Sequence, residues 1–61
     1  MSTLLTISEA SKFATEYIQK SVTESNISYL IQYGRIDKIE NGGVIYVDQE
    51  QLVSYYQSLL M

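Results

Sequence analysis

Five hydrogen-bonding side chains are spaced so that they would lie on the outer side of one short helix. They are Ser25, Asn26, Ser28, Tyr29 and Gln32. An asparagine or glutamine amide can form two hydrogen bonds with adenine, and a serine hydroxyl can donate or accept, so this set suits contact with base edges in a DNA groove. The alternative is the ordinary polar face of a solvated helix, which needs no ligand.

Tyr29 is the most informative member of this set, because an outward-facing aromatic side chain has little reason to be there in a lone monomer. Its ring could contact a thymine methyl group, or the side chain could contact a phosphate. It could equally anchor a protein interface, where tyrosine is enriched. The sequence leaves both alternatives open.

The chain has few of the side chains that usually catalyse reactions or bind metals. Cysteine and histidine are absent, which removes a thiolate metal site and the side chain best suited to acid–base work near neutral pH. The seven acidic residues do not pair into a catalytic dyad, and neither a glycine-rich phosphate loop nor a nucleophile motif appears. We therefore expect a protein that is not an enzyme and that uses no metal and no cofactor.

The charge balance limits the strength of any nucleic-acid contact. Seven acids outnumber four bases, for a net charge of −3, whereas cations that contact phosphates supply most of the affinity for DNA. Three of the four bases, Lys20, Arg35 and Lys38, nevertheless flank the polar segment. Arg35 and Lys38 are predicted on the first strand of a hairpin, where they could neutralise phosphates, although isolated surface cations are also common. The dipole of a preceding helix explains Lys20 equally well.

Two helices are predicted around this segment. The first spans residues 7–19 after a leader from Met1 to Leu5, and Thr6 and Glu9 have the spacing of a capping box at its start. The second spans residues 24–33. Thr23 can cap its start, and Gly34 can end it in the left-handed conformation. Its apolar face, opposite the polar set, consists of Ile27, Leu30 and Ile31.

A hairpin is predicted over residues 35–47, because Asn41-Gly42-Gly43 is a strong turn signal before a β-branched run. The same glycines could approach a minor groove, although a plain turn explains them. A third helix is predicted over residues 49–60, with Asp48 as its cap and Gln51 three residues on. The apolar stripe of this helix, expected in the core or partly in a dimer contact, consists of Leu52, Val53, Tyr56, Leu59 and Leu60, with Met61 beyond it.

The length and hydropathy of the chain set its class. Sixty-one residues of which 46% are apolar form one globular domain, which is marginal in stability on its own. No run of about 18 apolar residues is present, and the N-terminus lacks the pattern of a signal peptide. A cytoplasmic location without membrane contact is expected.

The stretch Leu5-Thr6-Ile7-Ser8-Glu9-Ala10-Ser11-Lys12-Phe13 resembles the opening of excisionase-like helix-turn-helix domains, relatives of the winged-helix domain of MerR-type regulators. The resemblance resumes at Val22 and continues to about Leu52. The segment from Asn26 to Ile36 is similar more particularly to modules at the N-termini of some DNA-modification methyltransferases. In this family the second helix enters the major groove and the hairpin lies beside it as a wing.

Three features depart from the family pattern. Residues 14–21 lengthen the first helix by more than a turn. The second helix has uncharged or acidic residues where many relatives carry arginine or lysine, and the wing lacks the arginines that are common there. The residues concerned are Glu24, Tyr29 and Gln32 in the helix, and Glu40, Val44 and Tyr46 in the wing.

The sequence thus predicts a mainly α winged helix-turn-helix with a two-stranded hairpin. The resemblance implies sequence-specific binding to double-stranded DNA, by a small transcription regulator, an excisionase-like factor or the recognition module of a DNA-modifying enzyme. A protein-interaction module on the same fold, a homodimer included, is the alternative. The predicted DNA-binding residues are Thr23, Ser25, Asn26, Ser28, Tyr29, Gln32, Arg35 and Lys38.

Overall fold

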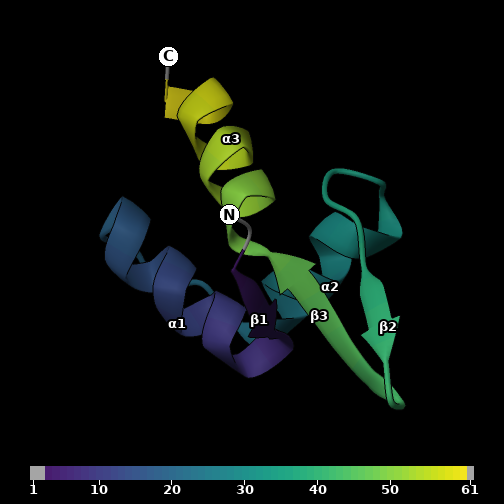
Figure 1. Ribbon diagram of the computed structural model, residues 1–61. Helices are drawn as coiled ribbons and strands as arrows, with labels where there is room; N and C mark the ends of the chain where they lie inside the picture. The colour runs from purple at the N-terminus through teal and green to yellow at the C-terminus, as the bar shows by residue number, and fades with distance from the viewer. Residues whose placement is uncertain (1–2, 61) are drawn as a thin grey trace.

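Three helices and a three-stranded antiparallel sheet make up the computed structural model, which describes residues 3–60 (Figure 1). In chain order the elements are β1 (Leu4–Thr6), α1 (Ile7–Ile18), α2 (Glu24–Gln32), β2 (Ile39–Asn41), β3 (Val44–Asp48) and α3 (Gln49–Leu60). No helix within the described range combines the length and the apolar character that crossing a bilayer requires.

The sheet has one strand more than the sequence predicted. Part of the expected leader, Leu4–Thr6, pairs antiparallel with β3, which therefore lies in the centre with β2 on its other side. The predicted hairpin is present as β2 and β3, but the assignment of Leu4–Thr6 to a leader was wrong. Three residues are too few to show a strand period, and their partner lies about 40 residues further along the chain. Met1 and Ser2, the rest of the expected leader, lie outside the described residues.

The first helix begins as predicted. The Thr6 amide donates to Glu9 Oε1 at 2.9 Å, and the Glu9 amide donates to Thr6 Oγ1 at 3.2 Å, which completes the capping box. The helix ends one residue earlier than predicted, at Ile18, because Gln19 adopts the left-handed conformation with φ of 60°. A left-handed residue at this position turns the chain out of the helix.

Thr15 fixes the short connection between α1 and α2. Its Oγ1 lies 2.9 Å from the Val22 amide, which donates to it, and 3.1 Å from the Val22 carbonyl. The same hydroxyl lies 2.8 Å from the Ser11 carbonyl, so its single proton is shared between two acceptors. These hydrogen bonds tie the connection before α2 to α1, and Val22 packs in the core.

The second helix ends in a Schellman motif. Gly34 has φ of 72°, its amide donates to Ile31, and the Arg35 amide donates to the Leu30 carbonyl at 2.8 Å. The prediction that Gly34 ends this helix in the left-handed conformation is confirmed, although the helix itself stops at Gln32. The chain then turns so that Ile36 is buried, with 3% of its surface exposed.

The hairpin differs from the prediction in where its first strand starts and in which residues form its turn. Its first strand starts at Ile39, so Arg35 and Lys38 lie in the preceding loop and not on the strand. Asn41 pairs with Val44, and the two central turn residues are Gly42 and Gly43, with φ of 61° and 79°. Two positive φ angles are what a tight hairpin turn with the twist of the strands requires, and glycine adopts a positive φ at little steric cost.

The core lies where α1, α2, α3 and one face of the sheet meet. Ala10 and Ala14 are fully buried on α1, and their small side chains allow the other elements to approach closely. The buried apolar residues are Ala10, Ala14, Val22, Ile27, Leu30, Ile36, Val47, Leu52 and Tyr56. Alternation along β3 turns Val47 into this core and Tyr46 to the other side of the sheet.

Only part of the apolar stripe on α3 is buried in the core. Leu52 and Tyr56 are buried as predicted, whereas Leu59 and Leu60 are 62% and 71% exposed because the last turn extends beyond the other elements (Figure 1). The Asp48 carboxylate accepts from the Glu50 amide at 2.8 Å and caps the helix. Gln51 does not complete a capping box, since its side chain binds Asp37 instead.

Candidate nucleic-acid interface

The outward face of α2 is uncharged apart from its first turn. Ser25, Tyr29 and Gln32 recur at i, i+4 and i+7 on the side opposite the buried Ile27 and Leu30, and all three are exposed. Ser28 lies beside them and is exposed as well. These four predicted site residues therefore share one accessible surface, which we call the α2 face.

Asn26 and Thr23 have a structural task that the sequence analysis did not assign in full. The Asn26 backbone N–H donates to Thr23 Oγ1 at 3.2 Å. The side-chain oxygen Asn26 Oδ1 accepts from the Thr23 backbone N–H at 3.0 Å and from the Thr23 hydroxyl at 3.1 Å. The two residues thus form a reciprocal cap. Both lone pairs of Asn26 Oδ1 are used, so paired hydrogen bonding to adenine would require the cap to open.

Tyr29 is joined on the α2 face by Tyr33, which the sequence analysis did not include. The two ring centroids are 4.3 Å apart with an interplanar angle of 37°, and the side chains are 55% and 59% exposed. Two aromatic residues at i and i+4 are neighbours on a helix. That spacing is a signal that could have identified Tyr33 from the sequence.

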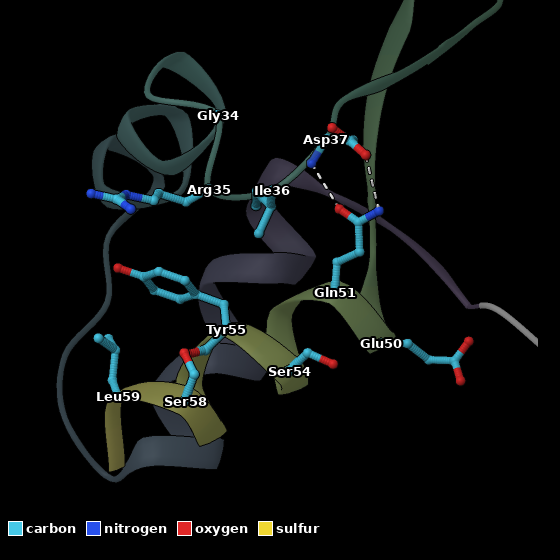
Figure 2. A pocket seen from close by; sticks show the side chains of 10 residues that line it. All are labelled: Gly34, Arg35, Ile36, Asp37, Glu50, Gln51, Ser54, Tyr55, Ser58 and Leu59. Atoms are coloured by element: carbon cyan, nitrogen blue, oxygen red, sulfur yellow. Dashed lines mark hydrogen bonds between the residues drawn. The ribbon is translucent and has the colours of Figure 1, made fainter. Parts of the chain in front are cut away.

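Cations lie near both ends of α2. Lys20 and Ser21, in the turn before the helix, line a hollow together with Asn26 and Tyr29. Arg35 follows Gly34 at the other end, and its side chain extends away from the loop in the same direction as Tyr55 (Figure 2). In the described part of the chain neither Lys20 nor Arg35 belongs to an ion pair.

Lys38 is placed differently from the other two cations. Its Nζ lies 3.4 Å from Glu40 Oε1, and both side chains are more than half exposed. An ion pair this exposed contributes about 0–1 kcal/mol to stability. Glu40 nevertheless offsets the charge that Lys38 could present to a phosphate.

The loop between α2 and β2 is held against α3 beside an open hollow. Gln51 Oε1 accepts from the Asp37 amide at 2.7 Å, and Gln51 Nε2 donates to Asp37 Oδ2 at 3.2 Å (Figure 2). Arg35, Tyr55 and Leu59 also line this hollow. The Asp37–Gln51 pair therefore fixes where the loop, with Arg35 and Lys38 on it, stands relative to the helices.

The hollow is lined by a mixture of charged, hydroxyl-bearing and apolar side chains. Within residues 3–60 no group of three or more acidic side chains is placed to hold a metal ion. Glu50 and Asp37 line the hollow at the edge farther from Arg35 (Figure 2). The arrangement is suited to contact along a surface more than to enclosure of a small molecule.

Comparison with known proteins finds one informative relative. The chain is 45% identical over 56 residues to the type II methyltransferase M.MjaII of Methanocaldococcus jannaschii. The match covers 92% of this chain and 11% of that protein. No family model matches the chain, and no solved structure matches it. The chain is thus similar to a short segment of a methyltransferase, and it spans about a tenth of that protein's length.

Proposed function

We propose that this chain binds double-stranded DNA as a winged helix-turn-helix, with α2 in the major groove and the β2–β3 hairpin as the wing. The observation that carries the proposal is the α2 face, which has unpaired cations on either side of it. Nine residues of helix measure about 13.5 Å, close to the major-groove width of about 12 Å. Lys20 and Arg35 can therefore reach phosphates on opposite sides of one groove.

The hairpin supports the same arrangement. It extends away from the helices, with the Gly42-Gly43 turn at its tip (Figure 1). Lys38 and Glu40 lie at its base, and no other cation is present between Ile39 and Asp48. We expect the wing to add shape complementarity along the DNA backbone and little charge.

The similarity to a type II methyltransferase supports a role in DNA modification over a role in transcription. We propose that the segment serves as a recognition module and has no catalytic function of its own. A small regulator or an excisionase-like factor would use the same α2 face. The recognition module of a modifying enzyme would act together with a catalytic part, whereas a small regulator would act without one. Both alternatives make the same prediction for DNA binding by this chain.

A protein-interaction surface is the second candidate, and one observation favours it. The sheet face opposite the core is uncovered and carries Leu4, Ile39 and Val44, which are 41%, 36% and 42% exposed. Leu59 and Leu60 form a separate apolar end on α3. Exposed apolar groups of this kind mark protein interfaces on many soluble domains.

Titration of the chain with a randomised duplex at several salt concentrations tests the first function. Lys20 and Arg35, together with Lys38 where the DNA phosphate displaces Glu40 from it, should give a shallow slope of about −2 to −3 in log K against log salt. Amide shifts in an NMR spectrum should fall on α2 and the hairpin. Shifts confined to α3 and the outer sheet face, with concentration-dependent broadening, would support the second function, and absence of binding to every selected duplex at low salt would refute the first.

Substitutions of single charges refine this test. Arg35→Ala should lower the affinity and reduce the salt slope by about 1, because one phosphate contact is lost. Lys12→Ala removes the same charge from α1, outside the proposed interface, and should leave the slope unchanged. Glu40→Gln releases Lys38 from its ion pair and should raise the affinity, whereas Glu16→Gln changes the net charge equally on α1 and should have a smaller effect.

A further inference from the structure

Tyr29 and Tyr33 form an exposed aromatic pair that the polar part of the proposed interface leaves unexplained. Each residue is more than half exposed, and the two rings are tilted against one another by 37° with their centroids 4.3 Å apart. Tyrosine side chains bury large areas at interfaces and lose few rotatable bonds when they do so. Tyr29 on α2 and Tyr33 at the C-cap of that helix lie side by side, which indicates a contact with an apolar component.

The surroundings of the pair restrict what that apolar component can be. Ser25, Ser28 and Gln32 are small or uncharged neighbours, and no acidic residue lies between Ser25 and Arg35. The cations Lys20 and Arg35 lie at the two ends. The tyrosine pair between two cations is complementary to the DNA major groove, where the methyl groups of thymine lie between the phosphates of the two strands.

We propose that the Tyr29–Tyr33 pair reads the C5-methyl group of pyrimidines in the major groove, and this rests on the proposed DNA-binding function. Thymine carries this methyl group in ordinary DNA, and 5-methylcytosine carries it in methylated DNA. Apolar side chains recognise the thymine methyl group by direct contact. The ring separation of 4.3 Å is close to the rise of about 3.4 Å between successive bases, so the pair can cover two adjacent pyrimidines of one strand.

The structure gives less support to hydrogen-bonded readout on this part of α2. Asn26, one of the two predicted residues whose amide suits adenine, uses its carbonyl oxygen in the helix cap, which leaves only Gln32 for such pairing. Ser25, Ser28 and Gln32 remain available for polar contacts, but they are present on many solvated helices. Specificity would therefore depend more on methyl contact than on amide–adenine pairing.

The test replaces bases within a duplex first selected from a randomised pool. In one set each thymine in turn becomes uracil, which removes only the methyl group. In a second set each cytosine becomes 5-methylcytosine. At one or two adjacent positions we expect a loss of about fourfold in affinity for uracil, or a similar gain for 5-methylcytosine, as corresponds to one methyl-sized group.

Variants connect these positions to the tyrosines. Tyr29→Ala and Tyr33→Ala should bind more weakly and should no longer distinguish the methylated from the unmethylated base. Tyr17→Ala removes a tyrosine that stacks on Phe13 of α1 and should keep the discrimination. Tyr29→Phe and Tyr33→Phe should also keep it, because the ring makes the contact; circular dichroism confirms that each variant is folded.

The outcomes separate this inference from the proposed function. Tight binding with no response to uracil or 5-methylcytosine at any position overturns methyl readout and leaves DNA binding intact. Loss of base discrimination in both phenylalanine variants would assign the discrimination to the tyrosine hydroxyls and not to the rings, and it too would overturn methyl readout. If the chain binds no duplex, the proposed function and this inference both fail.

Discussion

Asp37 and Gln51 bind one another through two hydrogen bonds, 2.7 Å from the Asp37 amide to Gln51 Oε1 and 3.2 Å from Gln51 Nε2 to Asp37 Oδ2. This pair joins the loop that precedes the wing to the first turns of α3. It also holds the loop where its neighbour Ile36 is buried. The position of Arg35 and Lys38, and hence of any phosphate contact they make, depends on a residue that lies beyond the hairpin.

Loss of the Gln51 side chain should loosen this loop. Gln51→Ala removes both hydrogen bonds and should lower the free energy of unfolding by about 1 kcal/mol, since the bonds are exposed to water. Hydrogen exchange of the Asp37 amide should accelerate at the same time. Asp37→Asn retains an acceptor for Gln51 Nε2 and is the matched control, and equal effects of the two substitutions would contradict the assigned pairing.

Substitution of Asn26 separates helix capping from base readout. Asn26→Ala removes the acceptor for the Thr23 amide and should cost about 1 kcal/mol, which corresponds to about 4–8 °C in Tm for a domain of this size. Asn26→Gln supplies an uncharged residue that is also usual at this position of a capping box and should restore the Tm. A variant with normal Tm but much weaker DNA binding would show instead that Asn26 contacts the ligand.

Gln19 offers a route to higher stability. It is the only non-glycine residue with positive φ among residues 3–60, at 60°, and a side chain there is strained. Gln19→Gly should raise the free energy of unfolding by about 0.5–1 kcal/mol in a thermal or urea melt. Glu16 lies inside α1 on an exposed face, so Glu16→Gly should lower the free energy of unfolding by about 1 kcal/mol.

Tyr56 makes the stability depend on alkaline pH. Burial raises the pKa of its phenol above the ordinary value of 10.0, and the neighbouring Tyr55 adds to the shift. The stability that this raised pKa contributes is fully present below pH 10.0 and is lost as the pH rises through the folded-state pKa, because the unfolded chain ionises first. Tyr56→Phe should flatten this part of the pH profile, which urea melts between neutral and alkaline pH would measure.

The sequence by itself determined where the helices begin and where α2 ends. The Thr6–Glu9 box, the Thr23 cap and the left-handed Gly34 are complete within a few residues of chain, and the structure contains each of them. Their hydrogen bonds need no distant partner. Local side-chain chemistry was therefore enough to decide them.

Only the tertiary structure decided which polar residues are available and which apolar ones are covered. Leu4–Thr6 becomes a strand because β3 supplies its hydrogen bonds, and Gln51 leaves the helix cap because Asp37 lies within reach. Leu59 continues the apolar stripe of α3 yet stays exposed, since no other element extends that far. Each of these outcomes depends on whether a segment far away in the chain lies within reach, and a pattern read along one segment does not contain that information.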